Sequence, residues 1–212
     1  MKGILFTGGQ GPGIQRCIQL VKDASIIVAA DSGLLLARRS GIKPDIIIGD
    51  MDSLGVSSIL NEYQAESIIK YSHNKDFTDT ELALDYLFNK DCDTVWIIGG
   101  GGGRLDHLLA VFYLFNRIKS PARWITDNED IFYLNEGLKL VKKAAEHSIV
   151  SVFPLGDGPW QLQSENLKWP VDFYKWEKGK FGISNRTVKN MYSLKSIMGK
   201  FLIIQNNPDG DD

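Results

Sequence analysis

The chain has 212 residues, enough for one large domain or two small ones that each bury a core. Its 24 basic and 26 acidic residues nearly balance, which argues against a nucleic-acid or anionic-membrane partner. No apolar stretch approaches the roughly 18 residues that span a bilayer. The start becomes glycine-rich after a short apolar run, which indicates a first strand and not a signal peptide. Cys17 and Cys92 are the only cysteines, and we expect them to be buried thiols of a cytoplasmic protein.

The first part of the chain alternates strand-like and helix-like stretches. Most strand-like stretches are continuous apolar runs, as expected of strands that helices cover on both faces. This alternation predicts a parallel sheet with flanking helices, whose ligands bind at the carboxyl edge of the strands. We expect strands at 3–7, 25–30, 45–48, 67–70, 94–98 and 123–126, and helices at 78–90 and 105–119.

The second predicted helix carries an apolar stripe. Its apolar residues recur at spacings of three and four, which is typical of a helix with one apolar face. The residues of the stripe are Leu105, Leu108, Leu109, Phe112 and Phe115.

The last part of the chain contains only short strand-like runs, separated by turn signals such as Gly156-Asp157-Gly158-Pro159. This pattern of short strands and turns predicts a small all-β sandwich or barrel. We therefore expect an α/β domain over residues 1–134 and a β-domain over residues 135–212. The expected strands are 138–141, 148–153, 160–163, 179–184, 187–192 and 200–204.

Aspartates follow several of the predicted parallel strands. Asp31 follows the second strand, Asp50 and Asp52 follow the third, and Asp76 and Asp79 follow the fourth. Residues two apart in an extended segment point the same way, so Asp50 and Asp52 can converge on one centre. Carboxylates held close together repel unless a cation lies between them. Mg²⁺ fits this pattern, because it accepts a few carboxylates together with phosphate oxygens.

A structural alternative explains any single one of these aspartates. Aspartates after strands often cap helices, and Asp76 with Asp79 would suit the start of the helix expected at Thr78. For one aspartate alone the two interpretations are about equal, whereas aspartates at three strand ends favour a metal site.

A run of five glycines, Gly99 to Gly103, lies between a predicted strand and a predicted helix. Glycines let backbone amides approach a phosphate closely, and Arg104 offers a planar donor fork for phosphate oxygens. A flexible surface turn is the alternative. No Lys-Ser/Thr pair follows, so the run is not a Walker-type loop. The candidate nucleotide-binding residues here are Gly100, Gly101, Gly102, Gly103, Arg104, and, as hydrogen-bonding support, Asp106 and His107.

Two further features give weaker signals. The turn Gly8 to Gly13 is glycine-rich and follows the first strand, but its spacing misses the dinucleotide fingerprint. In the β-rich part, Trp169 precedes Ser184 and Asn185, an aromatic face with polar neighbours that suits a flat cationic heterocycle. Taken alone, Trp169 is more often a core residue.

The order of these motifs resembles the thiamin pyrophosphokinase family over essentially the whole chain. Each motif is short, but their common order makes the resemblance specific. The motifs are Ala-Asp-Ser-Gly at 30–33, Gly-Asp-Met-Asp-Ser at 49–53, Lys-Asp-Phe-Thr-Asp at 75–79, Gly-Gly-Arg-Leu-Asp-His at 102–107, Leu-Lys-Trp-Pro at 167–170 and Gly-Ile-Ser-Asn at 182–185.

The resemblance implies a Rossmann-like catalytic domain followed by a β-sandwich, in a homodimer with active sites between the subunits. It implies transfer of a diphosphate from ATP to the hydroxyl of thiamin. Asp31, Asp50, Asp52 and Asp79 would hold Mg²⁺ and the triphosphate, and the glycine run with Arg104 would bind nucleotide phosphates.

The same resemblance assigns the thiamin-binding residues. Trp169 would stack on thiamin, while Ser184 and Asn185 would hydrogen-bond it. A pterin-type diphosphokinase, a metal-dependent phosphohydrolase and a binding module without turnover stay open as alternatives.

Overall fold

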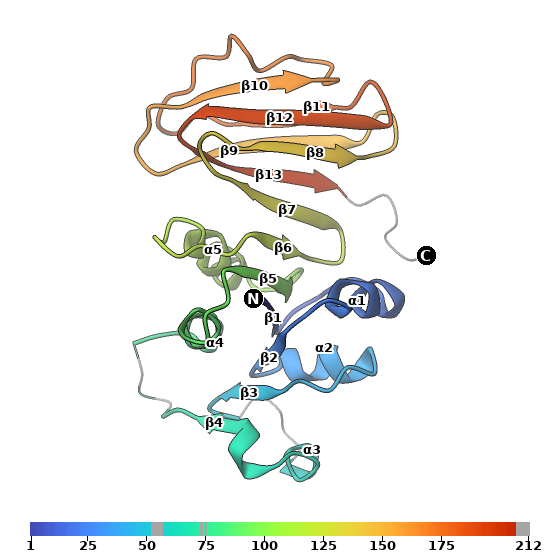
Figure 1. Ribbon diagram of the computed structural model, residues 1–212, viewed down its shortest axis with the longest axis vertical. Coiled ribbons are helices and arrows are strands. Elements are labelled where there is room, and N and C mark those ends of the chain that lie inside the picture. The colour runs from blue at the N-terminus through green and yellow to red at the C-terminus, as the bar shows by residue number, and fades with distance from the viewer. Residues whose placement is uncertain (52–56, 73, 75, 207–212) are drawn as a thin grey trace. The chain divides into compact units, whose positions relative to one another are not determined.

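The computed structural model describes residues 1–51, 57–72, 74 and 76–206, and its fold is mixed α/β (Figure 1). The chain divides into two compact units. The first comprises Met1–Leu114 and Trp124–Asp127, and the second comprises Phe115–Arg123 and the described residues from Asn128 onward. The expected division at residues 134 and 135 stays a prediction.

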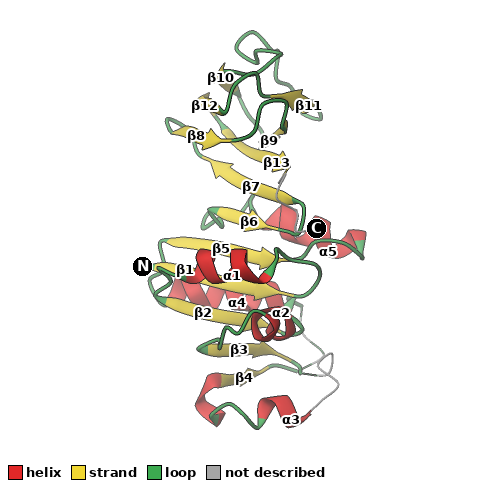
Figure 2. Cartoon of the chain, turned by 90° about the vertical axis from the view of Figure 1, so that its right-hand side faces the viewer, coloured by secondary structure: helices red, strands yellow, loops and turns green. Residues whose placement is uncertain are grey.

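The first unit contains a mostly parallel sheet, as predicted. Strands β5, β1, β2, β3 and β4 pair in parallel in that order, and β6 lies next to β5. Their arrowheads point the same way in Figure 2, so their carboxyl ends share one edge of the sheet. The strands are β1 (Lys2–Thr7), β2 (Ile26–Ala30), β3 (Ile46–Gly49), β4 (Ile68–Lys70), β5 (Thr94–Gly99) and β6 (Arg123–Ile125).

Helices cover both faces of this sheet. Helices α1 (Ile14–Val21) and α2 (Gly33–Arg39) lie on one face and α4 (Asp79–Asn89) lies on the other (Figure 2). The remaining helical elements are α3 (Ser57–Leu60), the 3₁₀ turn Ala65–Ser67 and α5 (Leu105–Leu114). No helix within the described residues is long and apolar enough to cross a membrane.

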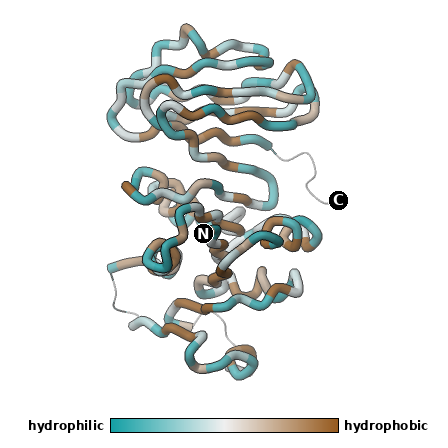
Figure 3. Tube along the Cα trace, viewed as in Figure 1, coloured by the Kyte–Doolittle hydropathy of each residue, from teal (hydrophilic) through white to brown (hydrophobic). Residues whose placement is uncertain are grey.

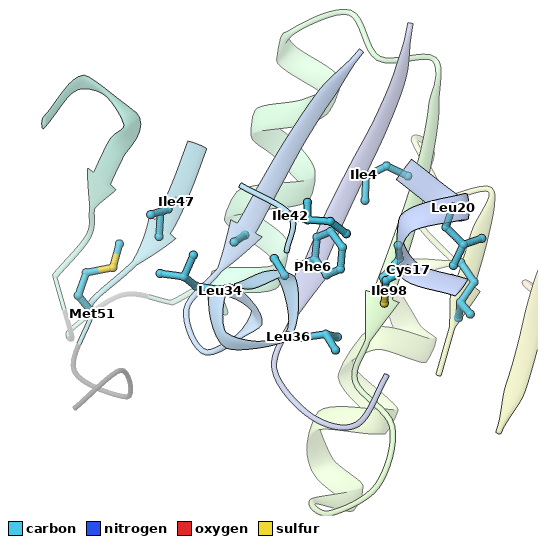
Figure 4. Packing of buried hydrophobic residues seen from close by; sticks show 13 residues of the cluster. Ile4, Phe6, Cys17, Leu20, Leu34, Leu36, Ile42, Ile47, Met51 and Ile98 are labelled. Atoms are coloured by element: carbon cyan, nitrogen blue, oxygen red, sulfur yellow. The ribbon is translucent and has the colours of Figure 1, made fainter. Parts of the chain in front are cut away.

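The core of the first unit explains why its strands are continuous apolar runs. Phe6 and Ile4 of β1 are fully buried and pack with Leu34 of α2 and Cys17 of α1 (Figure 4). The thiols of Cys17 and Cys92 are both buried, as expected from the sequence. Strands covered on both faces need apolar side chains on both, so they show no polar alternation.

The helix expected at 105–119 is shorter than predicted, and its buried face is different. Helix α5 ends at Leu114, with Val111 and Leu114 buried, whereas Leu105 is 68% exposed and Leu109 is 48% exposed. The expected apolar stripe was therefore wrong in part. Asp106 and His107 are the only polar residues of this helix, so periodicity could not select the buried face.

The second unit consists mainly of antiparallel strands. One set is ordered β11-β9-β13-β7, and a second set is ordered β10-β12-β8. Polar and apolar residues alternate along several of these strands (Figure 3), as expected where one face is solvated. The strands are β7 (Glu129–Leu134), β8 (Lys139–Lys143), β9 (Ile149–Leu155), β10 (Gln161–Glu165), β11 (Gly182–Arg186), β12 (Met191–Met198) and β13 (Lys200–Asn206).

Two strand predictions in this unit were displaced and one strand was missed. The strands expected at 179–184 and 187–192 are β11 and β12, shifted toward the C-terminus, and β7 was not predicted. Residues 187–190 form an isolated bridge at Thr187 followed by a bend, which interrupts the apolar pattern before Met191. Side chains from both strand sets, including Phe201, Tyr192 and Val152, share one buried cluster.

Phe6 gives a test of this core. Because its side chain is fully buried, Phe6→Ala should lower the free energy of unfolding by about 3–5 kcal/mol. Phe173 is 98% exposed, so Phe173→Ala should change it by about 0.5 kcal/mol or less. Urea unfolding followed by circular dichroism measures both, and equal effects would contradict the burial assignment.

Candidate active site

A cavity of about 240 Å³ opens at the carboxyl edge of the parallel sheet in the first unit. We call it the first cavity. It contains Asp31 and Asp79, which the sequence predicted to meet, together with several hydroxyl groups. Its lining residues are Thr7, Gly8, Ala30, Asp31, Ser32, Thr78, Asp79, Thr80, Gly100, His107, Ala110, Val111 and Leu114.

Asp31 lies in the turn that joins β2 to α2, and the turn fixes its side chain toward the first cavity. Its backbone N–H donates to the carbonyl of Ile48 at 2.8 Å, and its carbonyl accepts from Leu34 at 3.1 Å. Its φ of 45° is in the left-handed region, which aspartate tolerates better than most residues. Its Oδ1 atom is buried and has no hydrogen-bond partner among the described residues. A buried carboxylate oxygen without a donor is costly, so a cation or donor from a ligand suits this position.

Gly49 brings the carboxyl group of Asp79 near Asp31. A Cβ atom at Gly49 would lie 3.3 Å from the Cβ of Asp31 and 3.3 Å from the Oδ1 of Asp79. These two atoms are therefore no more than twice that distance apart. A side chain at Gly49 would occupy the space between them.

The start of α4 tests the helix-cap interpretation of Asp79. Thr78 is the N-cap, and its Oγ1 accepts from the N–H of Glu81 at 3.2 Å. In turn, the Oε2 of Glu81 accepts a hydrogen bond from the N–H of Thr78 at 2.8 Å. This capping box satisfies the first turn with other side chains, so Asp79 is not the capping residue.

The other predicted aspartates either do not line the first cavity or lie outside the described residues. Asp50 follows Gly49 directly and is half-buried, but it does not line the first cavity. Asp76 is exposed and does not line it either. Asp52 lies outside the described residues. Within the described residues, no group of three or more His, Cys, Asp or Glu side chains could hold a metal ion.

The backbone conformation and close packing of the protein itself require glycines in the run from Gly99 to Gly103. Gly99, Gly100, Gly102 and Gly103 have positive φ values, which a glycine adopts without steric cost. A Cβ at Gly99 would lie 2.3 Å from the carbonyl oxygen of Thr7. Only Gly100 of the run lines the first cavity, and nothing lies within 4 Å of a Cβ position at Gly103.

A backbone bridge joins the glycine run to the glycine turn after β1, a link that the sequence did not predict. Gln10 and Gly101 exchange two N–H···O bonds of 2.6 and 2.7 Å. A Cβ at Gly101 would lie 2.8 Å from the carbonyl oxygen of Gln10. The only available signal was two glycine-rich turns after two strands that proved to be neighbours.

Arg104 and Asp106 form an ion pair on the surface. The Nε and Nη2 atoms of Arg104 donate to the two carboxyl oxygens of Asp106 at 3.1 and 2.5 Å. These hydrogen bonds lower the pKa of Asp106 below its ordinary value. Neither residue lines the first cavity, while His107 does. Arg104 as a phosphate ligand and Asp106 as support therefore stay predictions.

Sequence reasoning missed the hydroxyl groups of the first cavity. Thr7 ends β1 and Thr80 lies in the first turn of α4, and their Oγ1 atoms are 2.7 Å apart. Ser32, directly after Asp31, also lines the cavity. Ser32 and Thr80 each follow an aspartate directly, which was the signal that could have identified them, whereas Thr7 had no such signal.

The predicted thiamin-binding residues lie in the second unit. The side chain of Asn185 is buried and clamps the backbone of Trp169: its Oδ1 accepts from the N–H at 3.1 Å, and its Nδ2 donates to the carbonyl at 2.6 Å. The indole of Trp169 is 53% exposed, and the Nζ of Lys168 lies 4.7 Å from its ring centroid. Trp169 is therefore not a core residue, contrary to the structural alternative.

Ser184 lies in an irregular part of β11. The pairing register with β9 shifts between Gly182 and Asn185, and Ser184 has a φ of 60°. Its N–H donates to the Oγ of Ser151 at 3.2 Å, and its side chain is exposed. A bulge of this kind redirects a side chain, which here presents the hydroxyl to solvent.

Comparison with known proteins shows which family this chain belongs to. Residues 17–146 match the profile of "Thiamin pyrophosphokinase, catalytic domain". The chain is 28% identical over 149 residues to the thiamine pyrophosphokinase of Bacillus subtilis, covering 68% of this chain and 70% of that protein. It is 26% identical over 148 residues to thiamine pyrophosphokinase 1 of rice, covering 63% of this chain and 55% of the rice protein.

Solved structures share the fold. The crystal structure of thiamine pyrophosphokinase from Bacillus subtilis superposes with a TM-score of 0.79 at 22% identity, covering 98% of this chain and 100% of that one. The enzyme from Candida albicans gives a TM-score of 0.72 at 20% identity, covering 97% and 89%. The family profile and the curated relatives confirm the resemblance in motif order, and the chain belongs to the thiamin pyrophosphokinase family.

Proposed function

We propose that this chain transfers a diphosphate group from ATP to the hydroxyl of thiamin, releasing AMP. The observation that carries the proposal is the family profile over residues 17–146, which includes Asp31, Asp79 and every other lining residue of the first cavity except Thr7 and Gly8. The family also favours thiamin over a pterin alcohol or water as the acceptor. In this reaction the thiamin oxygen bonds to the β-phosphorus, and the bond to the oxygen bridging to the α-phosphorus breaks.

The carboxylates of the first cavity fit a divalent cation. The buried, unpartnered Oδ1 of Asp31 and the nearby carboxyl group of Asp79 provide the hard oxygen donors that Mg²⁺ prefers. Asp50 and Asp52 would complete the set. Mg²⁺ bound there would neutralise phosphate charge that the carboxylates alone would repel.

The remaining residues of the first unit position the nucleotide phosphates. Thr7, Ser32 and Thr80 offer hydroxyl donors beside Asp31, while the backbone of Gly100 approaches from the glycine run. Arg104 would neutralise charge after leaving its surface pair with Asp106. Transfers of this type depend mainly on in-line placement and charge neutralisation, and one carboxylate of the group would accept the hydroxyl proton.

The second unit supplies the proposed acceptor surface. The exposed indole of Trp169 suits the cationic thiazolium of thiamin, and the hydroxyl of Ser184 is exposed for hydrogen bonding. The buried clamp of Asn185 on Trp169 supports a positioning role for Asn185 in place of direct thiamin contact.

Three broader features belong to the same proposal. We describe the first unit as a Rossmann-like domain and the second as a β-sandwich, which the shared buried cluster of its two strand sets supports. We propose a homodimer with active sites at the subunit interface, as the family resemblance implies. A cytoplasmic location is the third feature.

Product analysis tests the proposed reaction directly. The full-length protein incubated with ATP, Mg²⁺ and thiamin should give AMP and thiamin diphosphate in equal amounts, separated by chromatography. Consumption of ATP without thiamin would indicate a phosphohydrolase. Tight binding of ATP or thiamin without AMP formation would indicate a binding module.

Asp31→Asn tests the carboxylate site. The substitution keeps the shape and removes the charge, so kcat/KM should fall about 100-fold or more, the scale of one charge-stabilising group. Mn²⁺ binding followed by electron paramagnetic resonance should weaken in parallel. The control is Asp23→Asn, an exposed aspartate that does not line the first cavity, which should leave both readouts unchanged. Activity of Asp31→Asn within a few-fold of the parent would show that the assignment is wrong.

Trp169 and Asn185 form a second matched test. Trp169→Ala should raise the KM for thiamin about tenfold, because a cation over a desolvated indole contributes up to ~2 kcal/mol. Asn185→Ala should raise the same KM and also lower the free energy of unfolding by about 1–3 kcal/mol, because the backbone N–H and carbonyl of Trp169 lose their partner. Phe173→Ala is the exposed aromatic control. An unchanged KM for Trp169→Ala would contradict the stacking role.

A further inference from the structure

A cavity of about 200 Å³ lies at the amino edge of the parallel sheet, the edge opposite the one that carries the first cavity. It opens where the chain leaves α2 and enters β3, and the turn after α3 lines its other side. We call it the basic cavity. Its volume is below the range of about 300–1,000 Å³ that is usual for drug-sized ligands, so it suits a small ion or a small polar molecule. The described lining residues are Arg38, Gly41, Ile42, Lys43, Glu62 and Tyr63.

Positive charge predominates among the described lining residues of the basic cavity. Arg38 and Lys43 are cationic, whereas Glu62 is the one carboxylate among them. The Oε1 of Glu62 already accepts from the Nη2 of Arg38 at 3.1 Å. The Nζ of Lys43 lies 5.4 Å from the ring centroid of Tyr63, a cation–π contact that neutralises no charge. One positive charge is therefore uncompensated among these residues, which favours an anion as the ligand.

The guanidinium of Arg38 has an unused donor. Its Nη1 atom is buried and has no acceptor in the part of the chain that the structure describes. A buried donor without an acceptor is costly, so an acceptor from a ligand suits this position. The end of α2 does not need this side chain as a cap, because the N–H groups of Ser40, Gly41 and Ile42 already donate to carbonyls of the helix at 2.9–3.3 Å.

Tyr63 adds a third donor group, from the segment after α3. Its hydroxyl makes no hydrogen bond to another described residue, and burial raises its pKa above the ordinary value, so the phenol is a neutral donor at neutral pH. Ile42 belongs to the buried core cluster of the first unit (Figure 4), and Tyr63 packs against that cluster. The lining therefore rests on the packed core and is held in place before a ligand arrives.

We propose that the basic cavity binds a phosphate group, either as free inorganic phosphate or as the phosphate of a small monoester. Its lining offers three donor groups, the guanidinium of Arg38, the ammonium of Lys43 and the phenol of Tyr63. A phosphate has at least three terminal oxygens to accept from them, whereas a carboxylate has two. The inference does not depend on the proposed function, because none of the described residues that line the basic cavity lines the first cavity.

A titration with inorganic phosphate, followed by NMR of the methyl groups of Ile42, tests the proposal on the parent protein. Divalent cations are left out, so that the carboxylates of the first cavity repel the anion. We expect the signals of Ile42 to shift and to saturate. Methyl phosphate is the second probe: if it binds more tightly than inorganic phosphate, the ligand is a monoester, and if it binds more weakly, the ligand is the free ion. Acetate should bind about tenfold more weakly than the tighter of the two.

Lys43→Gln and Lys22→Gln form a matched pair of variants. Both lysines are exposed, but Lys22 lies at the end of α1 and lines neither the first cavity nor the basic cavity. Lys43→Gln should weaken phosphate binding about tenfold, the scale of one charge-assisted hydrogen bond, whereas Lys22→Gln should bind like the parent. Arg38→Gln should weaken it about tenfold or more.

The alternative is that Arg38 and Glu62 only fasten α2 to the segment after α3. In that case phosphate should leave the signals of Ile42 unchanged, and this result would overturn the proposal. Acetate that binds as tightly as phosphate, or Lys43→Gln that binds phosphate as tightly as Lys22→Gln, would overturn it as well. Because Lys43 is exposed, its variant keeps the test decisive even if Arg38→Gln fails to fold.

Discussion

The site depends on one steric fact, the missing side chain at Gly49. Parallel strands end at one edge of the sheet, which brings β2, β3 and the start of α4 together. Gly49 ends β3 between Asp31 and Asp79, and without a Cβ it leaves room for both carboxyl groups. Two carboxylates this close repel each other, and a buried oxygen without a donor adds to the cost. Such a site is unfavourable until a cation or a donor from a ligand reaches it, which is a property of a binding site.

Glycines also allow close backbone contacts at the carboxyl edge of the parallel sheet. The run after β5 meets the turn after β1 through the bridge between Gln10 and Gly101. Positive φ values and close approach of Thr7 account for most of the run. These contacts hold the run in one backbone conformation, which argues against a flexible surface turn.

Much of the fold could be predicted from the sequence because its signals are local. Continuous apolar runs identified the parallel strands, and alternation with turn residues identified the antiparallel ones. The bounds of β11 and β12 could not be predicted, because bends and a bulge near Ser184 interrupt the period of two. Strand β7 was also missed. The buried face of α5 was not predictable either, since nearly its whole circumference is apolar.

The candidate site could likewise be predicted only in part. Strand-end position was enough to predict that Asp31 and Asp79 would meet. The bridge at Gln10, the hydroxyl pair of Thr7 and Thr80, and the clamp of Asn185 on Trp169 join residues far apart in the sequence. Such contacts have no sequence period, so they follow only from the paired strands. The aspartates alone also could not show which residue caps α4, and the structure shows that it is Thr78.

A crystal structure with Mg²⁺ and a non-hydrolysable ATP analogue is the most direct test of the central claim. The account predicts a metal ion coordinated by carboxylate oxygens of Asp31 and Asp79, at the Mg²⁺–oxygen distance of about 2.0–2.1 Å or through one bound water. The phosphates should then lie beside Gly8 and Ser32, which line the first cavity. A metal ion and triphosphate bound away from both aspartates would contradict the account.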